Sequence, residues 1–425
     1  MEQTPKANRV HIGFFGRCNA GKSTLINMLT DQPVSLVSEV AGTTTDPVSK
    51  SMEILPLGPV VITDTAGIDD TSELGALRIE KSEEIIKKIN LAVYVLRNDK
   101  APTADDMMWL NKLKQNNVPI ALFINKINAF DSESDHDNDS NGNDTNLNYV
   151  DAYPDLSAIA TVVGSTDFTS NRDRLTLLDL LGGLTPLDVE GEQSLLQGLV
   201  DPGDTIILVC PIDSAAPKGR LILPQVQTIR EILDHKGLAL VCQTEELPAM
   251  LSKLSQKPKL VITDSQAFEA VNALTPADIP LTSFSILMAR FKGKLQDLVT
   301  GVKALNNLKP GARVLISEGC THRRQCDDIG TVKIPMWLKK KGHTDLQLEF
   351  TSGGAFPKDV SGYDLIIHCG ACMLTRREVL RRIDCAVVQG TPIVNYGVLI
   401  ASLHGILERA ISPFMDELDR KGFEC

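Results

Sequence analysis

The stretch that most constrains this chain begins at Gly16 and reads Gly-Arg-Cys-Asn-Ala-Gly-Lys-Ser. It fits the phosphate-binding pattern G-x-x-x-x-G-K-[ST], in which backbone N–H groups surround the phosphates, the lysine reaches the β and γ phosphates and the hydroxyl holds Mg²⁺. An apolar run at 11–15 predicts a buried strand before the loop, and the pattern at 24–29 predicts a helix after it. This order predicts a P-loop nucleotide-binding domain whose helix N-terminus attracts anions.

The residues of the loop have separate tasks. We expect six of them, and Thr24 directly after the loop, to contact the nucleotide: Gly16, Asn19, Ala20, Gly21, Lys22, Ser23 and Thr24. The Ser23 hydroxyl is the predicted Mg²⁺ ligand, and the Lys22 ammonium neutralises charge on the phosphates. The loop therefore predicts a nucleoside triphosphate as the ligand.

Two further motifs place groups at the γ-phosphate. The polar stretch at 41–46 contains Thr44, whose hydroxyl a mobile loop brings to Mg²⁺ and the γ-phosphate. The next buried strand ends in Asp64, which holds Mg²⁺ through water, and Gly67 lets a backbone N–H approach the γ-phosphate. We therefore predict that Lys22, Thr44 and Asp64 support catalysis by arranging charge and Mg²⁺, without covalent chemistry.

In this order and spacing, the motifs resemble the signature set of GTPases, which includes Asn125 and Lys126 after an apolar run. The sequence Gly-Thr-Thr ending at Thr44 is similar to the Era-like and tRNA-modifying branch. The resemblance implies that GTP is hydrolysed with Mg²⁺ and that Asn125 and Lys126 bind the base. It also implies that Asn19 helps to bind K⁺, so we expect slow hydrolysis that K⁺ stimulates.

Base recognition departs from this resemblance at Asn128. The family has an aspartate there, which accepts two hydrogen bonds from guanine, whereas an asparagine has one acceptor oxygen and its amide would face a donor. We expect weaker guanine selectivity. The last base contact falls on Ser157, whose Ser-Ala letters match the usual motif, or on Ser165; we favour Ser165 because a final strand at 161–163 would place it just beyond the strand end.

Length and charge limit the remaining possibilities. A chain of 425 residues is too long for one core and predicts about three domains. Its net charge of −11 argues against nonspecific binding to nucleic acid or anionic membranes, and no apolar run of about 18 residues predicts a membrane span. We expect a cytoplasmic protein, in which nine cysteines favour metal or redox chemistry over a disulfide framework.

Alternating strands and helices predict α/β folds along the whole chain. Residues 8–183 form a doubly wound parallel sheet, the predicted GTP-binding domain. From about 190 to 280, strand and helix patterns alternate without a phosphate loop and predict a small βαβ domain. The exposed edges of such a sheet could pair with a second copy.

Cysteines follow two apolar strands of the third domain, residues 281–425. One strand ends ahead of Cys320 and His322, and the other ends ahead of His368, Cys369 and Cys372. If the strands are parallel, the thiols meet at the carboxyl edge of the sheet. Thiolates suit Zn²⁺ or an iron–sulfur cluster, and three of them leave a fourth position open. Either histidine is a candidate fourth ligand or a hydrogen-bond partner beside the site.

These cysteines behind the GTPase motifs resemble the HydF maturation GTPases of FeFe-hydrogenases. The resemblance implies a GTPase domain, a dimerisation domain at 190–280 and a domain at 281–425 that carries a 4Fe-4S cluster on Cys320, Cys369 and Cys372. It further implies a homodimeric scaffold that takes a di-iron precursor of the H-cluster from radical-SAM maturases and delivers it to the apo-hydrogenase. The alternative is a zinc-stabilised Era-like GTPase that acts in RNA modification or ribosome assembly, against which the net acidity counts.

Overall fold

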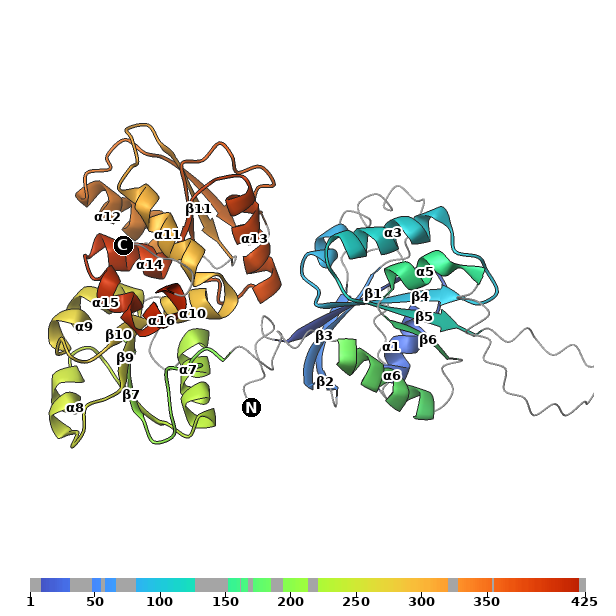
Figure 1. Cartoon of the computed structure of the whole chain (residues 1–425), viewed down its shortest axis with the longest axis horizontal. Helices are drawn as coiled ribbons and strands as arrows, with labels where there is room; N and C mark the ends of the chain where they lie inside the picture. The colour runs from blue at the N-terminus through green and yellow to red at the C-terminus, as the bar shows by residue number, and fades with distance from the viewer. Residues whose placement is uncertain are drawn as a thin grey trace, which may run out of the picture. The chain divides into compact units, whose positions relative to one another are not determined.

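The computed structural model divides the chain into two compact units, Met1–Gly191 and Glu192–Cys425. It describes residues 9–30, 48–54, 58–65, 82–126, 152–160, 162–166, 171–184, 194–212, 221–319, 328–353 and 355–419. No helix in these ranges is long and apolar enough to cross a membrane. The mixed α/β class predicted from the sequence is confirmed (Figure 1).

The first unit is built on a six-stranded sheet of order β2-β3-β1-β4-β5-β6. Its strands are β1 (Val10–Gly16), β2 (Val48–Ile54), β3 (Gly58–Asp64), β4 (Leu91–Arg97), β5 (Ile120–Asn125) and β6 (Val162–Thr166). Neighbouring strands are parallel, as predicted, except that the edge strand β2 runs antiparallel to β3. The sequence pattern had not indicated β2.

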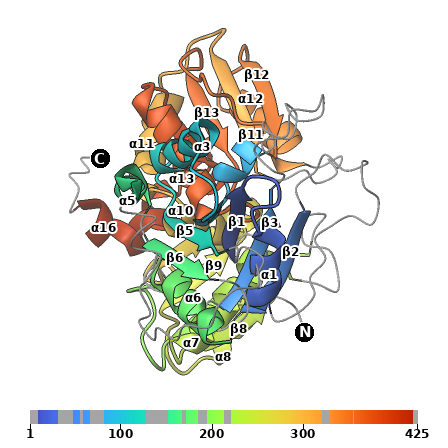
Figure 2. The same cartoon turned by 90° about the vertical axis from the view of Figure 1, so that its right-hand side faces the viewer.

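Helices cover both faces of this sheet. They are α1 (Lys22–Thr30), α3 (Ala104–Gln115), α5 (Pro154–Ile159) and α6 (Asn171–Leu184). Figures 1 and 2 show α3 and α5 on one side of the sheet and α1 and α6 on the other. Strands β4 and β5 are apolar along their length because both of their faces are buried.

The second unit contains two four-stranded sheets in which every neighbouring pair is parallel. The first sheet consists of β7 (Thr205–Val209), β8 (Leu238–Cys242), β9 (Leu260–Thr263) and β10 (Leu281–Ser283), with helices α7 (Leu223–Asp234), α8 (Leu247–Lys253), α9 (Phe268–Leu274) and α10 (Phe284–Lys292). Helix α11 (Leu295–Leu305) leads to the second sheet. That sheet consists of β11 (Arg313–Glu318), β12 (Gln347–Ser352), β13 (Leu365–His368) and β14 (Ile393–Asn395), with η4 (Ile329–Lys333), α12 (Ile334–Lys340), α13 (Arg376–Val388), α14 (Tyr396–Leu403), α15 (Leu407–Ile411), η5 (Ser412–Phe414) and α16 (Met415–Asp419).

The two sheets of the second unit have the same topology. The first has the order β10-β9-β7-β8 and the second, taken in the same direction, β14-β13-β11-β12. In each sheet, the strand that comes first in the sequence, β7 or β11, is central. The second strand lies beside it at one edge of the sheet, and the third and fourth strands lie on its opposite side. We call residues from β7 through α10 the first half and those from β11 through α16 the second half.

Local details repeat between the halves as well. Each begins with a Pro-Gly turn in which the glycine, Gly203 or Gly311, has a positive φ of 89° or 84°. In each half the fourth strand lasts three residues and ends at the N-cap of the following helix, Ser283 or Asn395. The sequences that follow are also alike, Phe-Ser-Ile-Leu-Met-Ala and Tyr-Gly-Val-Leu-Ile-Ala. The second unit is therefore an internally repeated structure.

One hydrophobic core runs through both halves. Helices α10 and α14 pack against each other at Gly397, where a Cβ atom would lie 2.8 Å from the Cβ of Ser285. The Thr282 hydroxyl donates to the Ala410 carbonyl at 2.9 Å, and Arg409 donates to the Ile279 carbonyl at 3.0 Å. The halves are therefore joined by packing and by hydrogen bonds between backbone and side chains.

Candidate functional site

Strand β1 delivers a phosphate loop whose backbone needs unusual residues. Gly16 and Gly21 have φ values of 136° and 103°, and Asn19 adopts 58°, the left-handed region that asparagine tolerates better than most residues. A Cβ on Gly16 would lie 2.5 Å from the Val95 carbonyl oxygen of the neighbouring strand β4. The glycines are therefore required by the turn and by its close approach to the sheet.

The phosphate loop is in contact with Asn125, from the predicted base-binding motif. Lys22 is buried, and its Nζ donates to the carbonyl oxygens of Gly16 and Arg17, each at 2.9 Å. From the end of β5, the Asn125 side-chain amide donates to the Ala20 carbonyl at 3.0 Å. The parallel sheet thus brings together residues more than a hundred positions apart, as its topology predicts.

Ser23, a predicted Mg²⁺ ligand, lies beside Asp64, which is predicted to hold the ion through water. The Ser23 hydroxyl donates to the Asp64 Oδ2 at 3.5 Å. Burial raises the pKa of Asp64, although the Lys22 ammonium and the Ser23 hydroxyl act in the opposite direction. A hydroxyl and a carboxylate beside an ammonium form the kind of oxygen site that binds Mg²⁺ at phosphates.

Several predicted nucleotide residues cannot be placed in this geometry. Thr44, Gly67 and Asn128 lie outside the described residues. Ser157 lies exposed in α5, whereas Ser165 lies within β6, paired with Ile124 of the adjacent strand. The strand therefore continues one residue past Ser165 instead of ending before it.

In the second unit, the strands that precede the cysteines are adjacent. Strands β11 and β13 are parallel, with Ser317 opposite His368. The Cys369 sulfur therefore lies at the carboxyl edge of the sheet, where it accepts hydrogen bonds from the Gly319 N–H at 3.0 Å and the Ala371 N–H at 3.4 Å. Backbone N–H bonds to sulfur stabilise a thiolate and are typical of cysteines that bind iron–sulfur clusters.

The third predicted cysteine follows Gly319 directly. Cys320 and His322 lie outside the described residues. In the described ranges, no group of three His, Cys, Asp or Glu side chains is placed to hold a metal ion. The described part of the edge thus supplies two thiols, on Cys369 and Cys372, and the backbone that leads to a third.

His368 is buried, and both of its ring nitrogens have partners. The Arg382 Nη1 donates to its Nε2 at 3.2 Å, so Nδ1 carries the proton and donates to the Cys369 carbonyl at 2.9 Å. Burial, with the Arg382 charge, lowers the pKa of His368 to about 4 and keeps the ring neutral. In this arrangement His368 orients the backbone of Cys369 and offers no free lone pair.

Two buried cations surround the cysteine loop, and sequence patterns had indicated neither. Arg382 is completely buried and donates to Glu378 at 2.8 Å. Lys292 reaches the loop from α10, and burial lowers its pKa to about 8 although the thiols of Cys372 and Cys369 act in the opposite direction. For Arg382 a signal was available in the sequence, because Glu378 stands four residues before it, the spacing of an ion pair on a helix.

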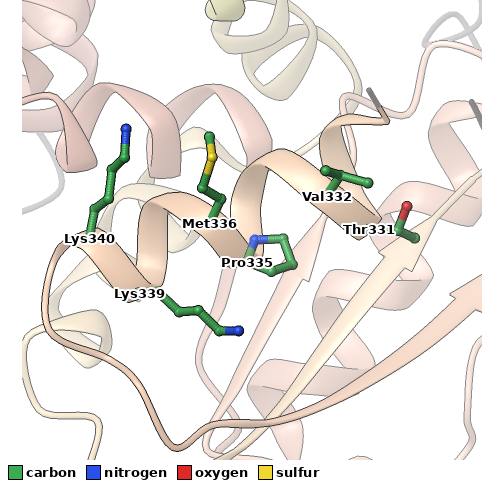
Figure 3. Close-up of a pocket in the computed structure, with 6 residues that line it drawn as sticks. All are labelled: Thr331, Val332, Pro335, Met336, Lys339 and Lys340. Atoms are coloured by element: carbon green, nitrogen blue, oxygen red, sulfur yellow. The ribbon is translucent and has the colours of Figure 1, made fainter. Parts of the chain in front are cut away.

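A surface hollow elsewhere in the second half carries no comparable chemistry. It is lined by Thr331, Val332, Pro335, Met336, Lys339 and Lys340, which belong to η4 and α12 (Figure 3). Figure 3 shows Lys339 and Lys340 extending to different sides of α12. None of its lining residues is a carboxylate, thiol or imidazole, so the cysteine edge and the phosphate loop are the stronger candidates.

Family models match three consecutive parts of the chain. A model described as the hydrogen maturase F (HydF) dimerization domain matches residues 195–293, and one described as the hydrogen maturase F tetramerization domain matches residues 296–413. A third, described as a 50S ribosome-binding GTPase, matches residues 11–126. The first HydF model therefore spans the first half of the second unit, and the second HydF model spans α11 and most of the second half. The GTPase model spans the phosphate loop and the strands through β5.

Curated relatives resemble the GTPase part. The tRNA modification GTPase MnmE of Endomicrobium trichonymphae is 32% identical over 121 residues, which are 28% of this chain and 26% of that protein. GTPase Der of Campylobacter curvus is 35% identical over 114 residues, 27% of this chain and 24% of that protein. The chain thus spans about a quarter of the length of these relatives.

Solved structures give a more distant likeness. Era in complex with MgGDPNP and a segment of 16S ribosomal RNA matches with a TM-score of 0.34 and 19% identity, over 55% of this chain and 93% of that chain. A probable GTP-binding protein, engB, matches with a TM-score of 0.31 and 19% identity, over 41% of this chain and 98% of that chain.

Proposed function

The chain belongs to the hydrogen maturase F family, because both domain models specific to that family and a GTPase model match it in order, and from this we propose that it is a GTPase that acts in FeFe-hydrogenase maturation. The observation that carries the proposal is the combination of a complete phosphate loop in one unit with a thiol-bearing strand edge in the other. Its place of action is the cytoplasm.

The nucleotide site hydrolyses GTP with Mg²⁺. Lys22, held within the loop, neutralises phosphate charge, and Ser23 and Asp64 hold the ion. Thr44 and Gly67 complete the site at the γ-phosphate. Asn125, Lys126, Asn128 and Ser165 bind the base. Asn19 helps to bind a K⁺ ion that stimulates slow GTP hydrolysis. Equal hydrolysis rates in Na⁺ and K⁺ buffers would contradict this role of K⁺.

The strand edge of the second half holds a 4Fe-4S cluster on Cys320, Cys369 and Cys372. Two sulfur-directed N–H bonds at Cys369 and a buried ammonium nearby suit a set of thiolates. Such a cluster supplies an iron with an exchangeable fourth coordination position. Both ring nitrogens of His368 are hydrogen-bonded, to the Cys369 carbonyl and to Arg382. His322 is therefore the remaining histidine candidate for that position. The protein uses this site to carry a di-iron precursor.

The predicted partners follow from this role. They are the radical-SAM maturases that supply the precursor and the apo-hydrogenase that receives it. The chain acts as a homodimer, in which the edge strand β8 pairs with its copy in a partner. Within the described residues, β8 has β7 as its one strand neighbour and carries the exposed side chains Leu238 and Val241.

Anaerobic purification followed by iron, sulfide and zinc analysis tests the proposal. We expect a brown protein with about four irons and four sulfides per chain after reconstitution, together with GTP hydrolysis. A colourless protein that contains zinc would favour the alternative, an Era-like GTPase in RNA modification or ribosome assembly. A protein that takes up no iron from iron and sulfide would contradict the proposed role.

A further inference from the structure

We propose that Lys292 is a positioning residue that fixes the Cys369–Cys372 loop and supplies a positive charge beside the bound cluster. The second part of this inference rests on the proposed iron–sulfur site, whereas the first concerns the protein without a cluster. Lys292 belongs to the first half of the second unit, and the loop belongs to the second half.

The contacts of Lys292 converge on one short loop. Its Nζ donates to the carbonyl oxygens of Leu374 at 2.8 Å, Cys372 at 2.9 Å and Ala371 at 3.4 Å. An ammonium has three protons to donate, so these three carbonyls account for its donors. The loop that carries the thiols of Cys369 and Cys372 is thus folded around this nitrogen.

The loop has a conformation that needs such support. Ala371, between the two cysteines, has a φ of 55°, which is unfavourable for a residue with a Cβ atom. Three carbonyls turned toward one point would repel one another if no cation stood between them. The ammonium compensates for both effects and determines where the Cys372 sulfur lies relative to Cys369.

Lys292 itself is held firmly. Its side chain is 2% exposed, and it stands in the last turn of α10. The next residue, Gly293, ends the helix at a tight contact, since a Cβ there would lie 2.8 Å from the Ala289 carbonyl and 3.1 Å from the Ile383 side chain. The end of α10 that carries Lys292 is therefore packed closely against α13.

The repeated half provides an internal comparison. Counted from the N-caps Ser283 and Asn395, the position of Lys292 corresponds to His404 at the end of α14. His404 lies 3.4 Å from Glu269, whose side chain is 79% exposed, and packs edge-on against the Trp337 ring. In both halves this position reaches into the other half, but only at Lys292 does it meet a cysteine loop.

Three full-length variants test the inference. Lys292→Met removes the hydrogen-bond donors as well as the positive charge. Lys292→Gln removes the charge but keeps N–H donors for the loop. Lys294→Met is the matched control, because Lys294 is half exposed and pairs with Asp384 on the surface. The circular dichroism spectrum and the rate of GTP hydrolysis of each variant are measured first, and both should match those of wild type.

The first measurement uses protein without iron. Hydrogen–deuterium exchange at 370–374 should be at least about tenfold faster in Lys292→Met, less affected in Lys292→Gln and unchanged in Lys294→Met. Equal exchange in Lys292→Met and Lys294→Met would overturn the positioning role, whether or not the protein binds iron.

The second measurement uses reconstituted protein. Lys292→Met should lose iron to a chelator about tenfold faster, and both Lys292 variants should have a more negative midpoint potential, because a nearby cation favours the reduced cluster. A potential that is unchanged in both variants would overturn the electrostatic role. Absence of iron from wild type would overturn the proposed function and this second role, while the exchange result would still decide the first.

Discussion

Glu378 illustrates how one carboxylate can hold a buried cation in place. It accepts hydrogen bonds from Arg381 at 2.7 Å and from the fully buried Arg382 at 2.8 Å. Although burial raises the pKa of Glu378, these two arginines lower it overall, so the carboxylate stays ionised. Through Arg382 it also orients His368 and the backbone of Cys369.

We therefore expect Glu378→Ala to destabilise the second unit by about 3–5 kcal/mol, because a buried guanidinium would lose its counter-charge. Calorimetry should show the transition of that unit about 10 °C lower. The control is Glu349→Ala, which removes the partner of Arg313 from a pair that is half exposed on both sides. If the unfolding temperature fell by a similar amount in the two variants, burial of the ion pair would not determine the loss of stability.

The residues that sequence reasoning could and could not predict differ in a physical way. The placement of Lys22, Asp64 and Asn125 at one edge of the sheet was predictable, because phosphate and Mg²⁺ binding require fixed residue types at the ends of adjacent parallel strands. Lys292 and Arg382 were not, because a buried charge is recognisable only from partners that distant elements supply. The roles proposed for all of the site residues, in the phosphate loop and at the cysteine edge alike, stay predictions.

Among the elements, the central strands were the easiest to predict. Strands β1, β4, β5, β7 and β11 are apolar runs bounded by polar residues. The parallel pairing of β11 with β13 was only a condition for the thiols to meet at one edge, and the structure fulfils it. The edge strands β2 and β12 were missed because their exposed faces carry polar residues that weaken the apolar pattern. The repeat in the second unit was also missed, because its strands agree in order and register more than in sequence.

The edge strand β8 leads to a prediction at this scale. We expect Val241→Lys to convert a dimer into monomers, because it adds a positive charge to each strand of the proposed β8 pair. Light scattering after gel filtration measures the mass. Val388→Lys serves as the control, because it places the same charge on α13 at a side chain that is 84% exposed. A dimer that survives Val241→Lys would place the contact on another surface.

At the scale of the whole molecule, the phosphate loop and the cysteine edge belong to separate compact units. We expect Cys369→Ala to abolish iron binding and to leave GTP hydrolysis within about twofold of wild type, because the described contacts of Lys22, Ser23 and Asn125 all lie within the first unit. Iron analysis and a phosphate-release assay on the same preparation measure both. Loss of hydrolysis together with iron would mean that the two units depend on each other for function.

The crossing of Lys292 from one repeated half into the other has a practical consequence for dissection of this protein. A recombinant piece that starts at residue 296, where the tetramerization model begins, would contain the three cysteines proposed to bind the cluster. It would lack Lys292, whose ammonium holds the loop of two of them. Such a truncation would report on a loosened thiol loop, so a minimal cluster-binding piece should begin before α10.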